Sequence, residues 1–181
     1  MCIRDRLYPN KIIITCDDDM MYRKNWLSKL YQAHENHPDH IVANQTRCIT
    51  YGSDGELLSY KAWKPNESGC QNPLLTLPIG AGGTLYPPDS MHKTVFNQEL
   101  FLQLTPKADD LWFKAMGLLK GTKSIQAQNS GKEPIPIWGS QKVSLKKGNI
   151  GMDKNRTQWQ ALTDHFQLKF ENIDWRNQQL C

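Results

Sequence analysis

The stretch Lys11-Ile12-Ile13-Ile14-Thr15-Cys16-Asp17-Asp18-Asp19 joins a short apolar, β-branched run to three consecutive carboxylates. The apolar run predicts a buried β-strand, of the kind that has neighbours on both sides in a parallel sheet. In layered α/β sheets, ligands collect at the carboxyl ends of strands, which is where these carboxylates lie. The stretch therefore predicts an α/β fold with a polar site at the end of this strand.

Patterns typical of helices and strands alternate along the rest of the chain. Apolar residues recur at helical spacing, and Pro38 and Gly121 stand where two helices should stop. We expect helices at Asn25 to His37, Asn97 to Leu104, Asp109 to Lys120 and Thr157 to Lys169. We expect strands at Ile41 to Ala43 and Ser124 to Gln128, a hairpin of Arg47 to Thr50 with Leu57 to Tyr60, and loops at Lys64 to Pro78 and Pro78 to Pro88. This alternation predicts an α/β layered sheet.

The composition limits the function classes. At 181 residues, the chain is long enough for one domain with a real core. No apolar run reaches the roughly 18 residues of a membrane span, and the charged opening MCIRDR does not favour a secretory signal. The net charge of +4 is spread over scattered Lys and Arg residues. We therefore expect no nucleic-acid partner, although a mildly basic face could rest on anionic lipid.

The cysteines give a prediction about the redox environment. Cys2, Cys16, Cys48, Cys70 and Cys181 are odd in number and form no CxxC pair. This usage is untypical of a zinc ribbon or of a disulfide framework. It favours a reducing compartment, the cytosol.

The three aspartates after the first strand admit two interpretations. Their mutual repulsion is relieved by a divalent cation, because Mg²⁺ and Mn²⁺ prefer oxygen ligands and complete their shell with water and substrate phosphates. On this interpretation Asp17-Asp18-Asp19 forms a metal–diphosphate site. The alternative is a solvated turn that caps the following helix. The residues alone leave both open.

A second acidic pair, Asp109-Asp110, stands at a predicted helix start. Carboxylates there are favoured by the positive end of the helix, so a capping role is sufficient explanation. The functional interpretation is a general base that takes a proton from an acceptor hydroxyl. In that case Trp112, two residues on, offers an apolar face for sugar stacking.

The sequence holds three motifs in order: strand–DDD–x2–Y–x3–W, then PIGAGGTLYPP at 78–88, then PKADDLWFKAMGLLKGTK at 106–123. Together they resemble the bacterial family 2-type glycosyltransferases of the GT-A fold. The resemblance covers about Tyr8 to Gln128, and more faintly the NRTQW segment to His165. It implies a GT-A-like, Rossmann-like mixed sheet flanked by helices. On this resemblance, we expect the first βαβ units of that fold to be missing from the sequence.

The resemblance also implies a donor site. Asp17-Asp18-Asp19 is similar to the DxD motif, which binds a divalent metal and the ribose or diphosphate of the donor. Asp17 and Asp19 satisfy DxD, but an alternative register places Cys16 first, so the aspartate that touches metal stays open. The loop with Gly80, Gly82 and Gly83 resembles the one near donor sugar and acceptor.

The catalytic residues follow from the same resemblance. Asp110 corresponds to the usual base, with Asp109 in support and Trp112 beside the acceptor. Some metal-dependent GT-A enzymes add a C-terminal histidine as a metal ligand, which here would be His165. The alternative for His165 is an ordinary surface position on a helix.

The implied reaction is inverting transfer of a sugar from a nucleotide sugar, with UDP as the expected nucleotide, to a hydroxyl of a glycan or lipid-linked sugar. The implied cofactor is Mn²⁺ or Mg²⁺, and the implied location is the cytoplasm, at the inner face of the membrane. A nucleotidyltransferase is the second enzyme candidate, but no glycine-rich basic phosphate loop stands near the N-terminus. A non-catalytic sugar-binding or partner-docking module, or an inactive fragment, is the alternative from another class.

The domain interpretation divides the chain into three parts. Residues 1–10 are expected to be an artefact or a truncated start, because MCIRDR resembles the adapter sequence at the ends of assembled environmental reading frames. Residues 11–170 are expected to be the C-terminal portion of one GT-A domain, and 171–181 a tail.

Overall fold

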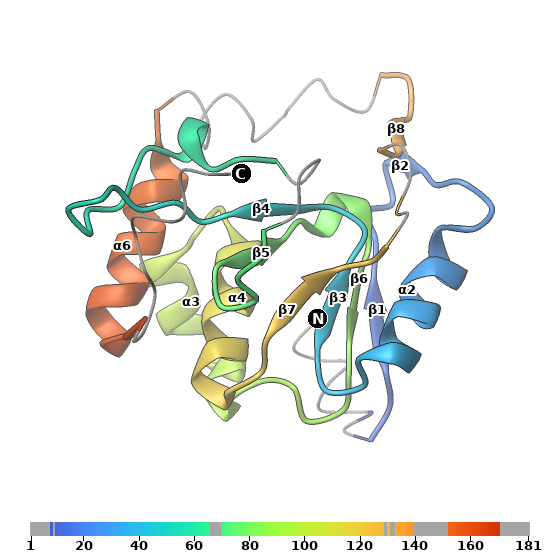
Figure 1. Ribbon diagram of the computed structural model, residues 1–181, viewed down its shortest axis with the longest axis horizontal. Helices are drawn as coiled ribbons and strands as arrows, with labels where there is room; N and C mark the ends of the chain where they lie inside the picture. Colours follow the sequence, from blue (N-terminus) through green and yellow to red (C-terminus); the bar gives the residue numbers. More distant parts are fainter. Residues whose placement is uncertain are drawn as a thin grey trace.

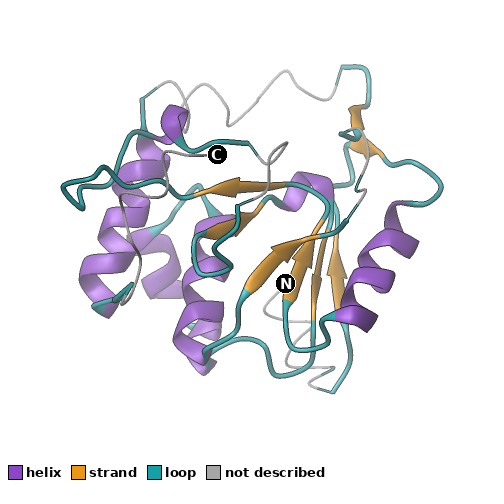
Figure 2. Cartoon of the chain, in the orientation of Figure 1, coloured by secondary structure: helices purple, strands orange, loops and turns teal. Residues whose placement is uncertain are grey.

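The computed structural model describes residues 8, 10–65, 70–128, 130, 133–139 and 152–170. Figures 1 and 2 show a mixed α/β molecule. The strands are β1 (Ile13–Thr15), β2 (Met20–Met21), β3 (Ile41–Ala43), β4 (Thr46–Cys48), β5 (Thr76–Pro78), β6 (Thr84–Tyr86), β7 (Ser124–Gln126) and β8 (Ile135–Pro136). The α-helices are α2 (Trp26–Asn36), α3 (Gln98–Leu104), α4 (Asp109–Lys120) and α6 (Lys154–Phe166). Short 3-10 turns are η1 (Tyr60–Ala62), η2 (Gly80–Gly82) and η3 (Lys93–Phe96).

The main sheet has four strands in the order β1-β6-β3-β7. Strand β6 runs antiparallel to both β1 and β3, and β3 runs parallel to β7. Helix α2 packs on β3 and β6, whereas α3, α4 and α6 lie together on the other side (Figure 1). Two smaller ladders, β4-β5 and β2-β8, complete the described sheets.

The core has two parts that follow from this layering. Between α2 and the sheet, Leu30 and Ala33 meet Val42 and Leu85, all of them buried. The larger part lies among α4, α6 and the β4-β5 ladder, and it holds three fully buried tryptophans, Trp63, Trp112 and Trp159. Large aromatic side chains therefore supply much of the apolar burial that stabilises this half.

Several sequence predictions are confirmed. The strand at Ile41–Ala43 and the helix at Asp109–Lys120 have the predicted bounds, and α2 and α3 lie within one residue of theirs. Gly121 ends α4 in the left-handed conformation, with a φ of 88°. The last helix runs from Lys154 to Phe166, three residues earlier at each end than predicted.

Other predictions about strands are wrong. In the described part of the sheet, β1 has a neighbour on one side only, pairs antiparallel with β6, and is half-buried rather than buried in a parallel sheet. Strand β6 lies inside the predicted loop Pro78 to Pro88, and β5 ends the predicted loop Lys64 to Pro78. The predicted hairpin is reduced to one bridge, Tyr51 with Leu57, because β4 pairs with β5 instead.

The cysteine prediction also needs correction. Cys48 of β4 forms a disulfide with Cys70, which precedes β5. The two cysteines are 22 residues apart in sequence, but the β4-β5 pairing brings their Cα atoms to 5.1 Å. Cys16 is free and exposed, while Cys2 and Cys181 lie outside the described residues. The argument for a reducing compartment from cysteine usage therefore loses its basis.

Candidate functional site

Three segments meet beyond the carboxyl end of β1. Because β1 and β6 are antiparallel, with Thr15 opposite Thr84, the acidic triplet 17–19 lies beside the glycine loop 80–83 that precedes β6. The start of α4 reaches the same place: the backbone N–H of Gly80 donates a hydrogen bond of 2.9 Å to Asp110 Oδ1. We call Asp17, Asp18, Asp19, Asp109 and Asp110 the acidic cluster.

Tyr22 holds the triplet against the glycine loop. Its hydroxyl accepts a hydrogen bond of 2.8 Å from the backbone N–H of Asp17 and donates one of 2.9 Å to the carbonyl of Ala81. Its ring stacks against Trp26 with the centroids 4.6 Å apart. Tyr22 and Trp26 are the tyrosine and tryptophan of the first sequence motif, but no role was predicted for Tyr22.

The glycines of this loop allow close contacts between its backbone and neighbouring side chains. A Cβ on Gly80 would lie 2.9 Å from Asp110 Oδ1, so only glycine allows the backbone to approach this carboxylate so closely. Gly83 has a φ of +88°, and a Cβ there would lie 2.7 Å from the Trp26 ring. A Cβ on Gly82 would lie 2.6 Å from the Gln45 side chain. Of the three predicted glycines, Gly80 is the one that contacts the acidic cluster.

The electrostatics show that the two acidic segments are close neighbours. Burial first, and then the charge of Asp109, raise the pKa of Asp110 to about 8; the Gly80 N–H opposes this shift, and Asp17 adds to it. Partial burial, followed by the charges of Asp19, Asp109 and Asp18, raises the pKa of Asp17. Carboxylates that raise one another's pKa form a site of negative charge, and a bound cation would relieve the repulsion between them.

Two predicted site residues lie elsewhere. Trp112 is 1% exposed, donates its indole N–H to the Val95 carbonyl at 3.3 Å, and packs edge-on against Phe101. The expectation that it stacks on a sugar is therefore wrong, because its faces are covered by the core. His165 is exposed on the last turn of α6, with its ring against Phe166, and α6 packs on α3 and α4. Among the described residues, His165 belongs to no group of three or more side chains that could hold a metal ion.

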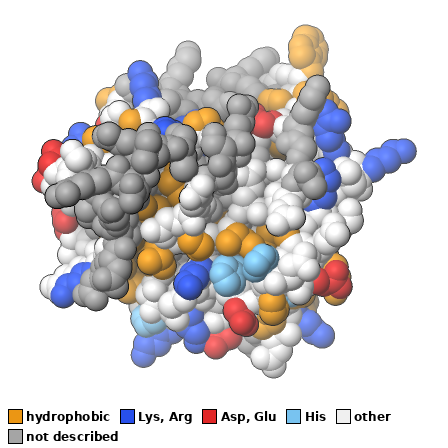
Figure 3. Space-filling view, viewed as in Figure 1, with side chains coloured by type: hydrophobic (Ala, Val, Ile, Leu, Met, Phe, Trp, Pro, Cys, Tyr) orange, Lys and Arg blue, Asp and Glu red, His pale blue; other side chains and the backbone are white. Residues whose placement is uncertain are grey.

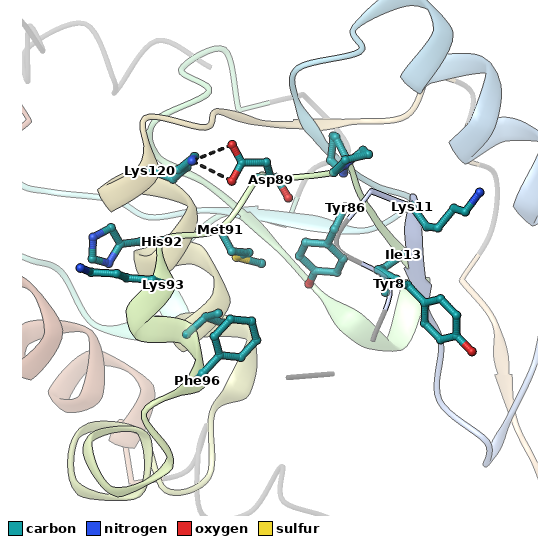
Figure 4. A pocket seen from close by; sticks show the side chains of 14 residues that line it. Tyr8, Lys11, Ile13, Tyr86, Asp89, Met91, His92, Lys93, Phe96 and Lys120 are labelled. Atoms are coloured by element: carbon teal, nitrogen blue, oxygen red, sulfur yellow. Dashed lines mark hydrogen bonds and ion pairs between the residues drawn. The ribbon is translucent and has the colours of Figure 1, made fainter. Parts of the chain in front are cut away.

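A separate pocket of about 420 Å³ opens at the opposite end of β1. Figure 4 shows Met91 and Phe96 on one side of it and Tyr86 and Ile13 on the other, with the ion pair of Lys120 and Asp89 at its edge. The acidic cluster does not line this pocket. Among the residues that the structure describes, no three His, Cys, Asp or Glu side chains converge closely enough to hold a metal ion.

No family model, no curated protein and no solved structure matches this chain. Across its described parts, no helix is both long and apolar enough to cross a bilayer. Function must therefore be inferred from the acidic cluster and its surroundings.

Proposed function

We propose that this chain carries the catalytic residues of a nucleotide-sugar-dependent glycosyltransferase with a GT-A-like fold. The observation that supports it most is Asp110: a carboxylate oriented by the Gly80 N–H at 2.9 Å, with its pKa raised to about 8, beside a second acidic segment. A capping role alone does not account for this arrangement, because Asp110 makes its side-chain bond to Gly80, thirty residues away in sequence.

Asp110 is suited to act as a general base. A base works best when its pKa is near the operating pH, and the raised pKa of Asp110 meets that condition. In the reaction, the acceptor hydroxyl gives its proton to Asp110 while its oxygen attacks the anomeric carbon. The bond between that carbon and the diphosphate oxygen breaks, and the nucleoside diphosphate leaves with the electron pair. The resemblance to family 2-type enzymes supplies the inverting stereochemistry.

The carboxylate oxygens of the acidic triplet 17–19 are the kind of ligand that a divalent cation prefers. Mn²⁺ or Mg²⁺ bound by one or two carboxylates takes its remaining ligands from water and phosphate, so a preformed set of three protein ligands is not required. Asp17, Asp18 or Asp19 would hold the ion, and the mutual repulsion that raises the pKa of Asp17 would be relieved. Such an ion supplies positive charge for the departing diphosphate.

A sugar-binding module without catalysis is less well supported. Such a module would need exposed aromatic faces, but Trp63 and Trp112 are both buried in the core, and Trp138 is the one fully exposed tryptophan among the described residues. Such a module would also not require a carboxylate with a raised pKa, such as that of Asp110.

Titration calorimetry with MnCl₂ and UDP tests the proposal. We expect UDP to bind more tightly in the presence of Mn²⁺, and the double variant Asp17→Asn/Asp19→Asn to lose this dependence. Asp89→Asn is the matched control, because Asp89 lies at the opposite end of the sheet and is exposed. UDP binding that is indifferent to Mn²⁺, or equal losses in the control, would contradict a metal–diphosphate site at the triplet.

A further inference from the structure

The pocket of about 420 Å³ at the far end of β1 has no part in the proposed sugar transfer. Its volume falls within the roughly 300–1,000 Å³ of clefts that bind small molecules. The lining residues come from the start of β1, the end of β6 with the turn after it, η3, and the last residue of α4. Its walls and its rim therefore indicate what kind of ligand it takes.

Apolar side chains form two facing walls of the pocket. Met91 and Phe96 lie on one side, and Ile13 and Tyr86 lie on the other (Figure 4). Tyr86 is 4% exposed, and its ring packs edge-on against Phe113 with the centroids 6.0 Å apart. A methionine thioether and aromatic rings on facing walls favour a flat aromatic group between them.

The rim of the pocket is positively charged. Lys11, Lys93 and Lys120 line it, and Asp89 is the one acidic residue among the described lining residues. Lys120 and Asp89 form an ion pair of 2.8 Å, whereas Lys11 and Lys93 are in no ion pair within the described part of the chain. Figure 4 shows the ammonium groups of these two lysines at the outer edges of the pocket, as expected of side chains that keep their charge in water. An anion at the mouth would therefore gain from two uncompensated positive charges.

This excess of one charge distinguishes the rim from the rest of the surface. On the face shown in Figure 3, acidic and basic side chains are interspersed. The lining of the pocket instead has three lysines and one aspartate, which give it a net charge of +2 with histidine neutral. The charge of the lining is thus complementary to an anionic ligand.

His92 adds a hydrogen-bond donor to the same rim. Its Nδ1 accepts a hydrogen bond of 3.3 Å from the backbone N–H of Thr94. In the neutral ring the proton therefore lies on Nε2, which can donate to a carboxylate. The backbone N–H of His92 donates to the Met116 carbonyl of α4 at 3.1 Å, so the residue is held in place before a ligand binds.

We propose that this pocket binds a small aromatic acid. The aromatic ring lies between the two apolar walls, and the carboxylate lies at the rim near Lys11, Lys93 and His92. This site goes beyond the proposed glycosyl transfer and does not rest on it.

Methyl NMR spectroscopy with 2-naphthoate as the probe tests the proposal. The methionine methyl groups are isotope-labelled, and the Met91 signal is assigned by its absence from Met91→Leu, a substitution that conserves volume. We expect 2-naphthoate to shift the Met91 signal through the ring current and to bind with a Kd of roughly 0.1–1 mM. The neutral 2-naphthalenemethanol has the same ring system, and we expect it to bind about tenfold more weakly.

Two double variants separate the charge of the rim from general surface charge. Lys11→Gln/Lys93→Gln should weaken the binding of 2-naphthoate about fivefold and leave the affinity for the alcohol unchanged. Lys24→Gln/Lys61→Gln is the matched control, because both lysines are exposed and lie outside the pocket. Circular dichroism must show the same fold for each variant.

Several outcomes would overturn the proposal. They are an unmoved Met91 signal at concentrations about tenfold above the expected range, equal affinities for the acid and the alcohol, and equal losses in the two lysine variants. A dimer that Met91→Glu converts to monomers in sedimentation equilibrium would instead assign the pocket to a second copy of this chain. Asp17→Asn/Asp19→Asn should keep 2-naphthoate binding, so a failure here and a failure of the proposed function are separate results.

Discussion

Two side chains on α4, Asp110 and Lys114, titrate far from their ordinary ranges. They are four residues apart. The largest cause of each pKa shift is burial, which penalises the charged form and so raises the pKa of Asp110 and lowers that of Lys114. Lys114 is 1% exposed and donates hydrogen bonds to the Pro73 carbonyl at 3.1 Å and to Ser124 Oγ at 3.3 Å. Both partners are neutral, so the pKa of Lys114 falls to about 7.

Lys114 should make stability depend on pH above neutrality. The folded protein loses this proton near pH 7, whereas the unfolded chain keeps it until its ordinary pKa of 10.5. The unfolded state therefore binds more protons between these values, and the free energy of unfolding rises with pH, by at most about 1.4 kcal/mol per unit. Urea unfolding at pH 7, 8 and 9 measures the effect.

The Lys114→Met variant isolates this contribution from other titrating groups. We expect the difference in unfolding free energy between the unsubstituted protein and Lys114→Met to shift by roughly 2 kcal/mol in favour of lysine between pH 7 and 9. A difference that is constant across this range would show that Lys114 keeps an ordinary pKa in the folded state.

The helices were more predictable than the strands, for physical reasons. The bounds of α4 were visible because acidic residues at its start and glycine at its end are local signals. The start of α6 was missed because Asp153 precedes it with a φ of 53° and uses its carboxylate to accept the Tyr60 N–H at 2.7 Å. This contact joins residues 93 apart and leaves no local signal.

The strands in the described part of the chain are three residues long or shorter, so alternation along them carries little information. Strand β6 was not predicted because glycines precede it and prolines follow it in the sequence, although it pairs with β1 on one side and β3 on the other. The acidic segments of the site were found from the sequence, because carboxylates at a strand end and a helix start are local features. Their contact through Gly80, and the Tyr22 bridge, depend on non-local pairing.

The C-terminal stop of α4 gives a clean test of backbone strain. Gly121 has a φ of +88°, and a Cβ there would meet no atom within 4 Å. Gly121→Ala should therefore cost about 1 kcal/mol of stability from conformation alone. Gly121→Asn should cost less, because asparagine tolerates the left-handed region better. Thermal unfolding of both variants measures this; equal stability for alanine and glycine would contradict it.

At the scale of the whole molecule, the Cys48–Cys70 disulfide links strand β4 to the segment that precedes strand β5. A crosslink that closes a loop of this length limits the unfolded chain and contributes about 3 kcal/mol. We expect dithiothreitol to lower the urea midpoint of the unsubstituted protein. Cys48→Ser/Cys70→Ser should be insensitive to the reductant, and alkylation followed by mass spectrometry checks the pairing. An unchanged midpoint on reduction would show that the crosslink has no such role.

Asp110 is the proposed base of the sugar transfer, and the whole proposed function depends on that role. The most direct measurement is the release of UDP from a panel of UDP-sugars with Mn²⁺, by the unsubstituted protein and by Asp110→Asn. We predict that the substitution lowers UDP release by about 10²- to 10⁴-fold, the usual contribution of a general base, while the Mn²⁺-dependent affinity for UDP is retained. Undiminished UDP release by Asp110→Asn would contradict the account.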